Sequence, residues 1–163
     1  MKNAIILLLL VGLCGCFGRE PEKTVLKGKS MPSFNLLLAD SITHLNTISI
    51  PAGKPIVLFY FGPNCPYSRA QMDEIIENMP SLKDIQFYIF TTAPFPEMKG
   101  FYDHYQLRKY PNMAVGLDYD NFFSDYFKAI GVPYMAIYGR DKRLNEAFVG
   151  KVGGSQIKEI AEK

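Results

Sequence analysis

The apolar run 55–61 constrains the fold of this chain more than any other stretch of its sequence. It has the length of a strand, and it lies between Gly53 and the pair Gly62-Pro63, residue types that interrupt regular structure. A continuous apolar strand of this kind is typical of the centre of a sheet whose two faces are both covered. The sequence therefore predicts an internal strand with other elements packed on either side.

Apolar runs of strand length alternate with segments of helical period along the rest of the chain. Strands are expected at 35–38, 45–50, 85–91, 113–117, 134–138 and 144–149, and helices at 66–79, near 98–105, at 121–130 and from 155 onward. Pro66 fits the first turn of its helix, Pro80 is expected to end it, and Ser155 can cap the last helix. This order predicts one layered α/β domain with parallel crossovers in its middle and an antiparallel hairpin at its end.

Composition argues against a nucleic-acid partner and against a metal site. The formal net charge is +2, and the lysines and arginines do not gather into a basic patch. A cysteine without a nearby histidine cannot supply the three or four ligands that zinc needs. We therefore expect no metal and no cofactor, and we interpret His44 and His104 as ordinary surface residues.

The N-terminal stretch has the order of an export signal. Lys2 is followed by the apolar run 4–13, which is too short for the roughly 20 residues that cross a bilayer. The stretch then ends in Leu-Cys-Gly-Cys, which resembles the lipobox of bacterial lipoproteins, with Cys16 as the lipidated residue. A buried strand and an uncleaved anchor are the alternatives.

This interpretation divides the chain into a signal peptide at 1–15, a tether at 16–32 and a domain at 33–163. It implies a protein exported and lipid-anchored to a bacterial membrane, on its periplasmic or outer face. Cys14 would leave with the signal and Cys16 would carry lipid, so Cys65 would be the free thiol of the mature protein. Without a partner for a disulfide, Cys65 is either a reactive thiol or an inert buried one.

The position of Cys65 favours the reactive alternative. It is expected at the junction between the apolar strand 55–61 and the helix 66–79, where unpaired backbone N–H groups and the helix dipole favour thiolate over thiol. Arg69, one turn further on, can add to this effect. The sequence therefore predicts that Cys65 is a nucleophile.

The same stretch, Phe-Gly-Pro-Asn-Cys-Pro-Tyr-Ser at 61–68, resembles the active-site segment of the thioredoxin superfamily. Gly-Val-Pro at 131–133 matches the place where that superfamily has a cis-proline beside the active-site cysteine. Upstream, GKSMPSFNLLLAD and GKPIVLFYF resemble the N-terminal hairpin of the redoxin branch, which includes membrane-tethered TlpA-like thiol-disulfide oxidoreductases. The resemblance covers about residues 28–163.

The resemblance implies a thioredoxin-like fold, with a central mixed sheet flanked by helices and an N-terminal β-hairpin extension. It also implies a catalytic Cys65 supported by Ser68 and Arg69. Substrate would dock along Pro66, Tyr67, Val132 and Pro133. The implied partners are protein thiols or disulfides of the cell envelope, and possibly a low-molecular-weight thiol.

Several residues depart from the family pattern. Ser68 occupies the place of the resolving cysteine, so no internal disulfide can form, and Phe59 stands where thioredoxins keep a buried acid. The chain also lacks tryptophan. Leu58 and Gly62 replace the residues of the peroxidatic pattern of peroxiredoxins, which argues against peroxidase activity.

Two functions therefore remain open. One is monothiol thiol-disulfide exchange through Cys65, in which an external thiol resolves the mixed disulfide. The alternative is a non-catalytic thioredoxin-fold binding module that holds a polypeptide partner in the same groove.

Overall fold

The computed structural model of the protein describes residues 18–163. The predicted signal peptide at 1–15 and the predicted lipid site Cys16 lie outside these residues. No helix in the described part of the chain is both long enough and apolar enough to cross a bilayer.

A seven-stranded mixed sheet organises the domain, in the order β2-β1-β5-β4-β3-β6-β7. Its strands are β1 (Asn35–Leu38), β2 (His44–Asn46), β3 (Ile56–Tyr60), β4 (Gln86–Thr91), β5 (Met113–Leu117), β6 (Tyr134–Tyr138) and β7 (Leu144–Val149). Strand β4 pairs in parallel with β3 and β5, and the other pairs are antiparallel. The predicted parallel middle and the predicted terminal hairpin are both confirmed.

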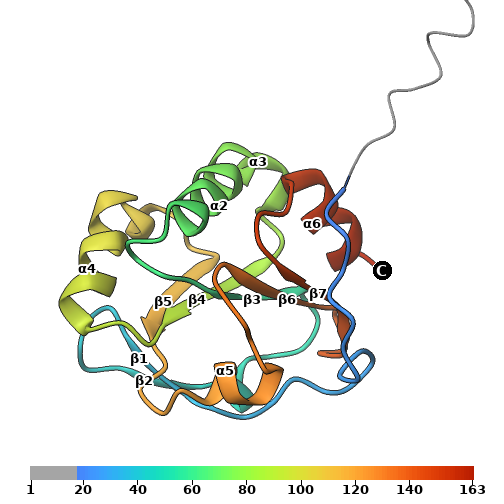
Figure 1. Cartoon of the computed structure of the whole chain (residues 1–163), viewed down its shortest axis with the longest axis horizontal. Helices are drawn as coiled ribbons and strands as arrows, with labels where there is room; N and C mark the ends of the chain where they lie inside the picture. The colour runs from blue at the N-terminus through green and yellow to red at the C-terminus, as the bar shows by residue number, and fades with distance from the viewer. Residues whose placement is uncertain (1–17) are drawn as a thin grey trace, which may run out of the picture.

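Helices cover both faces of this sheet, as Figure 1 shows. Helices α2 (Pro66–Glu77), α3 (Met79–Leu82), α4 (Phe95–His104) and α6 (Gly154–Ala161) lie on one face, and α5 (Phe122–Phe127) lies on the other. Two short 3-10 helices, η2 (Thr47–Ser49) and η3 (Leu107–Lys109), complete the described elements. The arrangement places α2 directly over the central strands.

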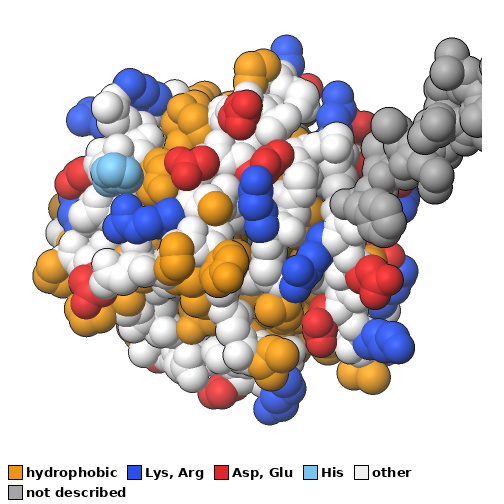
Figure 2. All heavy atoms as spheres, turned by 45° about the horizontal axis from the view of Figure 1, so that its top comes forward, with side chains coloured by type: hydrophobic (Ala, Val, Ile, Leu, Met, Phe, Trp, Pro, Cys, Tyr) orange, Lys and Arg blue, Asp and Glu red, His pale blue; other side chains and the backbone are white. Residues whose placement is uncertain are grey.

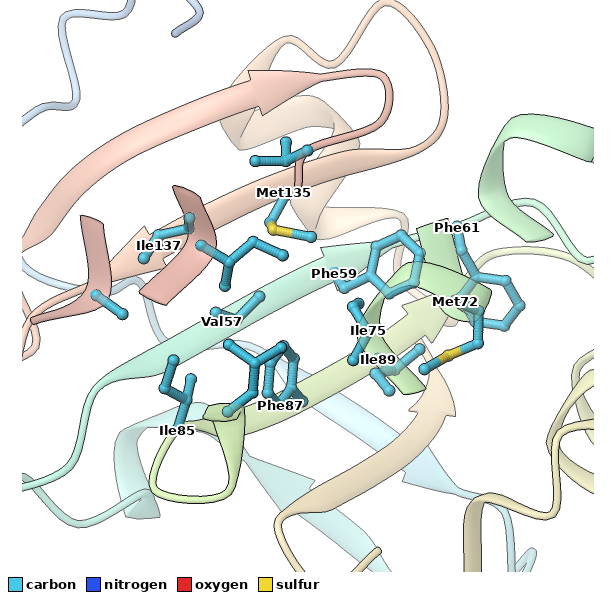
Figure 3. Packing of buried hydrophobic residues seen from close by; sticks show 14 of the residues in the cluster. Val57, Phe59, Phe61, Met72, Ile75, Ile85, Phe87, Ile89, Met135 and Ile137 are labelled. Carbon is cyan, nitrogen blue, oxygen red and sulfur yellow. The ribbon is translucent and has the colours of Figure 1, made fainter. Parts of the chain in front are cut away.

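Strand β3 separates two hydrophobic cores. Val57 and Phe59 point to the core under α2, where Figure 3 shows them beside Met72 and Ile75. The alternate residues of β3 point to the core under α5. Residues 56–59 are all fully buried, which confirms that the apolar run is an internal strand.

Three element boundaries differ from the sequence prediction. The strand expected over 45–50 turns into η2 after Asn46, because the Asn46 side chain accepts a hydrogen bond from the Ile48 N–H. Pro80 does not end a helix but lies in the first turn of α3, a position that needs no N–H donor. Helix α6 starts with Gly153 as its N-cap, so Ser155 is not the cap.

Helix α5 is also shorter than predicted. It ends at Phe127, because Lys128 adopts a left-handed conformation with φ of 53°. The expected helix over 121–130 therefore stops before Ile130, and the remaining residues form the loop that leads to β6. Ile130 is left 86 % exposed.

The stretch predicted to be a tether contacts the domain from Arg19 onward. Glu22 donates its N–H to Ala147 O at 2.6 Å, and Gly28 donates to Leu144 O at 2.8 Å, both on β7. Figure 1 shows this segment running past α6 and along the β7 edge of the sheet. We call residues 18–31 the strap.

Candidate functional site

Cys65 lies between the end of β3 and the start of α2. Its N–H donates to Gly62 O at 3.0 Å, which closes a turn after the strand. Cys65 itself is the N-cap of α2, with extended backbone angles, and Pro66 occupies the first helical turn, where no N–H is needed. The predicted strand-to-helix junction is therefore present.

The N-cap position places Cys65 beside unpaired backbone donors. The first N–H groups of a helix have no acceptor within the helix, and at an N-cap the side chain is the group closest to them. Cys65 makes no capping hydrogen bond with its side chain. The N–H groups of Tyr67 and Ser68 are the donors that an acceptor at this position can reach.

The sulfur of Cys65 touches a cis peptide bond that comes from a distant part of the chain. The bond between Val132 and Pro133 is cis, and Cys65 Sγ donates to Val132 O at 3.6 Å. The contact follows from the topology, because β6 pairs antiparallel with β3 and Tyr60 lies opposite Tyr134. The end of one strand and the start of the other therefore meet at one edge of the sheet.

Gly62 permits this close approach. A Cβ atom at this position would lie 3.1 Å from Cys65 Cβ and 3.1 Å from Val132 Cγ2, which is tighter than ordinary packing. Any side chain larger than hydrogen would press on both neighbours. In the sequence, Gly62 was considered as a residue that ends the apolar strand and as a departure from the peroxidatic pattern. Its packing role depends on a contact across 70 residues of chain.

Ser68 is fully buried and supports the turn before the cysteine. Its hydroxyl accepts a hydrogen bond from the Gly62 N–H at 3.1 Å. The hydrogen bond of the Cys65 sulfur goes to Val132 O instead. Ser68 thus satisfies a backbone donor of the loop and reaches the sulfur only indirectly.

Arg69 directs its polar contacts to α4. Its carbonyl accepts from the Tyr105 hydroxyl at 3.3 Å. Burial raises the pKa of Tyr105, the nearby Asp73 raises it further, and the Arg69 guanidinium opposes this rise. The charge of Arg69 therefore acts on Tyr105 and Asp73 as well as on the first turn of α2.

Exposed apolar groups flank the cysteine. Pro66 is exposed, Tyr67 is 68 % exposed, and Ile130 in the loop before the cis bond is 86 % exposed. Cys65 itself is half-buried. Figure 2 shows hydrophobic side chains on this side of the molecule interspersed with charges of both signs. The site thus combines a reachable sulfur with exposed apolar groups.

A buried amide on α2, missed in the sequence, fixes the helix to the C-terminal part of the domain. Gln71 is fully buried, its Oε1 accepts from Val152 N–H at 2.6 Å, and its Nε2 donates to Val152 O at 3.0 Å. Its position three residues after Ser68, on the face that also buries Met72 and Ile75, was the available signal. A polar residue within an apolar helical face needs a specific partner.

Glu74 adds a second link one turn further along α2. Its carboxylate accepts from Gly154 N–H at 2.9 Å and pairs with Lys151 Nζ at 2.7 Å. The hydrogen bond from Lys151, followed by that from Gly154, lowers the pKa of Glu74. Gln71 and Glu74 together attach α2, from its middle onward, to residues 151–154.

The other titratable candidates lie elsewhere. His44 is exposed on β2 at the edge of the sheet, and His104 is exposed at the end of α4. Within residues 18–163, no three His, Cys, Asp or Glu side chains are placed to hold a metal ion. Among residues 18–163, Cys65 is the only cysteine, and its thiol is free.

Several solved structures similar to this chain are described as disulfide or thiol-disulfide oxidoreductases. A secreted disulfide oxidoreductase of Mycobacterium tuberculosis, described as homologous to E. coli DsbE, matches with a TM-score of 0.64 and 18 % identity, over 78 % of this chain and 92 % of its own. A putative thiol:disulfide interchange protein DsbE from Chlorobium tepidum matches with a TM-score of 0.65 and 16 % identity, over 82 % and 92 %.

The thioredoxin domain of a thiol-disulfide oxidoreductase from Bacteroides vulgatus matches with a TM-score of 0.64 and 12 % identity, over 83 % of this chain and 95 % of its own. No family model matches the chain, and no curated protein matches it significantly. The similarity thus lies in the arrangement of the elements more than in the sequence. The described chain has a thioredoxin-like fold, with a mixed sheet flanked by helices and an N-terminal β-hairpin.

Proposed function

We propose that this protein is an exported, lipid-anchored thiol-disulfide exchange protein that uses Cys65 as its only nucleophile. The observation that carries the proposal is the position of the sulfur. It lies at the N-cap of α2, half-buried, in contact with the Val132–Pro133 bond. The structural similarity to thiol-disulfide oxidoreductases supports the same chemistry.

The exchange proceeds in two balanced steps. The Cys65 thiolate attacks one sulfur of a partner disulfide, a Cys65–partner disulfide forms, and the other partner sulfur leaves as a thiolate. A second thiolate, from another protein or a low-molecular-weight thiol, then attacks the partner sulfur and releases Cys65 as thiolate. No net oxidation of the protein occurs over the cycle.

Ionisation of Cys65 changes its contacts in a defined way. The thiol donates to Val132 O, and a thiolate has no proton to donate. The negative sulfur instead favours the N–H donors of the first turn of α2 and the positive end of the helix dipole. Losing the proton thus frees the Val132 carbonyl, which lies at the edge where an extended substrate segment would dock.

Docking involves the groups that remain open around the sulfur. Pro66 and Tyr67 on one side, with Val132 and Pro133 on the other, would hold an extended partner segment across Cys65. The exposed apolar side chains of Tyr67 and Ile130 suit an apolar or neutral segment better than a highly charged one. Ser68 and Arg69 act as positioning residues, through the Gly62 turn and through α4.

One observation favours the alternative, a binding module without catalysis. The Ser68 side chain is fully buried, and its hydroxyl accepts a hydrogen bond from the Gly62 amide. At the position of a resolving thiol, this chain therefore has a residue that stabilises the loop. A site stabilised in this way can hold a polypeptide without releasing a disulfide. The two functions differ in whether Cys65 forms covalent adducts.

Trapping of mixed disulfides separates the two functions. The protein is expressed in a bacterial host, cells are quenched with acid, and adducts are resolved on non-reducing gels with mass spectrometry of the Cys65 peptide. The exchange function predicts adducts that disappear on reduction and in Cys65→Ala, and that persist in Tyr67→Ser at a reduced level. Complete absence of adducts, with partner copurification unchanged in Cys65→Ala, would establish the binding module.

The Ser68→Cys variant tests the geometry of the site. A thiol at this position lies one helical turn from Cys65 and can serve as a resolving group. We expect this variant to reduce insulin in the presence of dithiothreitol faster than the native protein and Ser68→Ala, which need dithiothreitol to resolve each mixed disulfide. No insulin reduction by a folded Ser68→Cys variant would contradict the proposed placement of Cys65.

A further inference from the structure

The strap is fixed to the domain at its very first residues. Arg19 donates its backbone N–H to Gln156 Oε1 at 2.8 Å, and Gln156 Nε2 donates back to Arg19 O at 2.6 Å. Arg19 also packs against Gly150, where its guanidinium fills the space beside the glycine. The chain is therefore attached to α6 immediately after it enters the described part of the structure.

The short length of chain between Cys16 and Arg19 limits how far apart these two residues can lie. Two residues lie between Cys16 and Arg19, and the three residue steps that join them span at most about 11 Å. A group bound covalently to Cys16 therefore stays within about 11 Å of Arg19. A free tether through residue 32 would have allowed roughly five times this distance.

We propose that the corner of the domain around Arg19 lies directly on the lipid bilayer, which fixes the orientation of the whole domain. This corner, the anchor corner, is formed by residues Gly18, Arg19, Lys151, Ser155, Gln156 and Glu159, which line one hollow. The inference rests on the proposed lipid at Cys16 and adds a contact surface and an orientation to it. The partner is the lipid surface reached by the acyl chains.

Charge does not supply the attraction at this corner. The hollow is lined by two basic residues, Arg19 and Lys151, and by two acidic ones, Glu74 and Glu159, and Lys151 is paired with Glu74 at 2.7 Å. A surface that binds anionic lipid electrostatically carries an excess of Lys and Arg. The contact therefore depends on the anchor and on the short reach, and it does not require anionic headgroups.

This orientation holds the candidate site away from the membrane. The anchor corner adjoins the C-terminal end of α2, where the Asn78 side chain packs tightly against Gly154. Cys65 lies at the other end of that helix, and twelve residues of α-helix are about 18 Å long. Cys65 is thus kept about one helix length from the anchored corner, where folded or extended polypeptides of the envelope can reach it.

The test measures the distance of two positions from the bilayer in the lipidated protein. Full-length chain carrying Cys65→Ser is purified from bacterial membranes, with a single fluorophore on Glu159→Cys or on Ile42→Cys. Ile42 is 79 % exposed in the β1–β2 connection, at the β2 edge of the sheet. Six strand spacings, about 29 Å, separate this edge from the β7 edge. The protein is reconstituted into phosphatidylcholine vesicles that contain a headgroup spin-labelled lipid as quencher.

We expect quenching at position 159 to be at least threefold stronger than at position 42. Insertion of six Gly/Ser residues between Phe17 and Gly18 lengthens the chain that joins Cys16 to Arg19. The domain is then no longer held in one orientation, so quenching at the two positions should become nearly equal. Equal quenching without the insertion, in protein whose Cys16 peptide carries the lipid mass, would overturn the inference and leave the anchor intact. An unmodified Cys16 would overturn both, and the same mass measurement reports it.

Discussion

The two ends of α2 are held in opposite ways. From its middle onward it is bonded to residues 151–154 through the buried amide of Gln71 and the carboxylate of Glu74. Its N-cap residue, Cys65, makes no side-chain capping bond, and the hydrogen bond of its sulfur goes to Val132 O at 3.6 Å. The helix is therefore fixed at one end and open at the other.

This difference shows how the fold can hold a reactive side chain in a fixed position and leave the surface around it open. A functional side chain is positioned accurately when it stands on a rigid element whose own contacts lie elsewhere. The links at 71 and 74 leave the surface around Cys65 free for a partner, and they still determine where the sulfur points. We expect changes at the bonded end to cost stability and changes at the open end to alter reactivity.

The largest effect is expected from Gln71→Leu. Leucine leaves the N–H and C=O of Val152 buried without partners, and each unpaired group costs about 1–3 kcal/mol. We expect the free energy of unfolding in urea to fall by about 2–4 kcal/mol. Glu77→Leu, at an exposed position of the same helix, is the matched control, with a change within about 0.5 kcal/mol. Equal effects of the two variants would show that the Gln71 link does not hold the helix.

Gly62→Ala acts on the open end. Its Cβ would lie 3.1 Å from both Cys65 Cβ and Val132 Cγ2, so these residues must move apart. We expect a loss of about 1–3 kcal/mol of stability and a several-fold change in the rate at which Cys65 reacts with iodoacetamide. Gly100→Ala on α4, where an added Cβ meets nothing within 4 Å, serves as control and should stabilise slightly. An unchanged Cys65 rate in Gly62→Ala would contradict the close packing of this turn.

Glu74→Gln has the smallest expected effect and a defined pH dependence. Because the pKa of Glu74 is lowered in the folded state, its charged form stabilises the protein above the pKa of the unfolded chain, and this contribution disappears as the pH falls through the folded value. We expect Glu74→Gln to lose about 1 kcal/mol at pH 7 and nearly nothing at pH 3. Urea unfolding of both proteins at the two pH values measures this. A loss of the same size at pH 3 would mean that packing, and not charge, is responsible.

The sequence predicted the sheet more accurately than the site. The apolar run 55–61 and the alternation around it were enough for the central strands, since burial on both faces leaves a clear pattern. Pro80 and Ser155 were misjudged because each residue type fits two neighbouring positions at a helix end, and only backbone geometry separates them.

At the site, local pattern and the family resemblance together indicated Cys65 and its cis-proline. The sequence did not reveal the roles of Gly62, Gln71 and Arg19. Each of them contacts a residue more than 65 positions away, on another element, and no local period records such a pairing. The role expected for Ser68 changed for a local reason, because its hydroxyl bonds the Gly62 amide, six residues earlier, which only the folded turn brings to it.

The rate of alkylation of Cys65 as a function of pH tests the central claim most directly. Full-length protein reacts with iodoacetamide in native buffer and in 8 M urea between pH 5.5 and 8.5, and the Cys65 peptide is quantified by mass spectrometry, with Cys65→Ala as blank. Ordinary thiols lose about tenfold in rate for each pH unit below about 8.5. A reachable sulfur beside the free N–H donors at the start of α2 predicts a native rate above the unfolded rate at pH 6.5. A native rate more than a hundredfold below the unfolded rate at every pH would contradict the account.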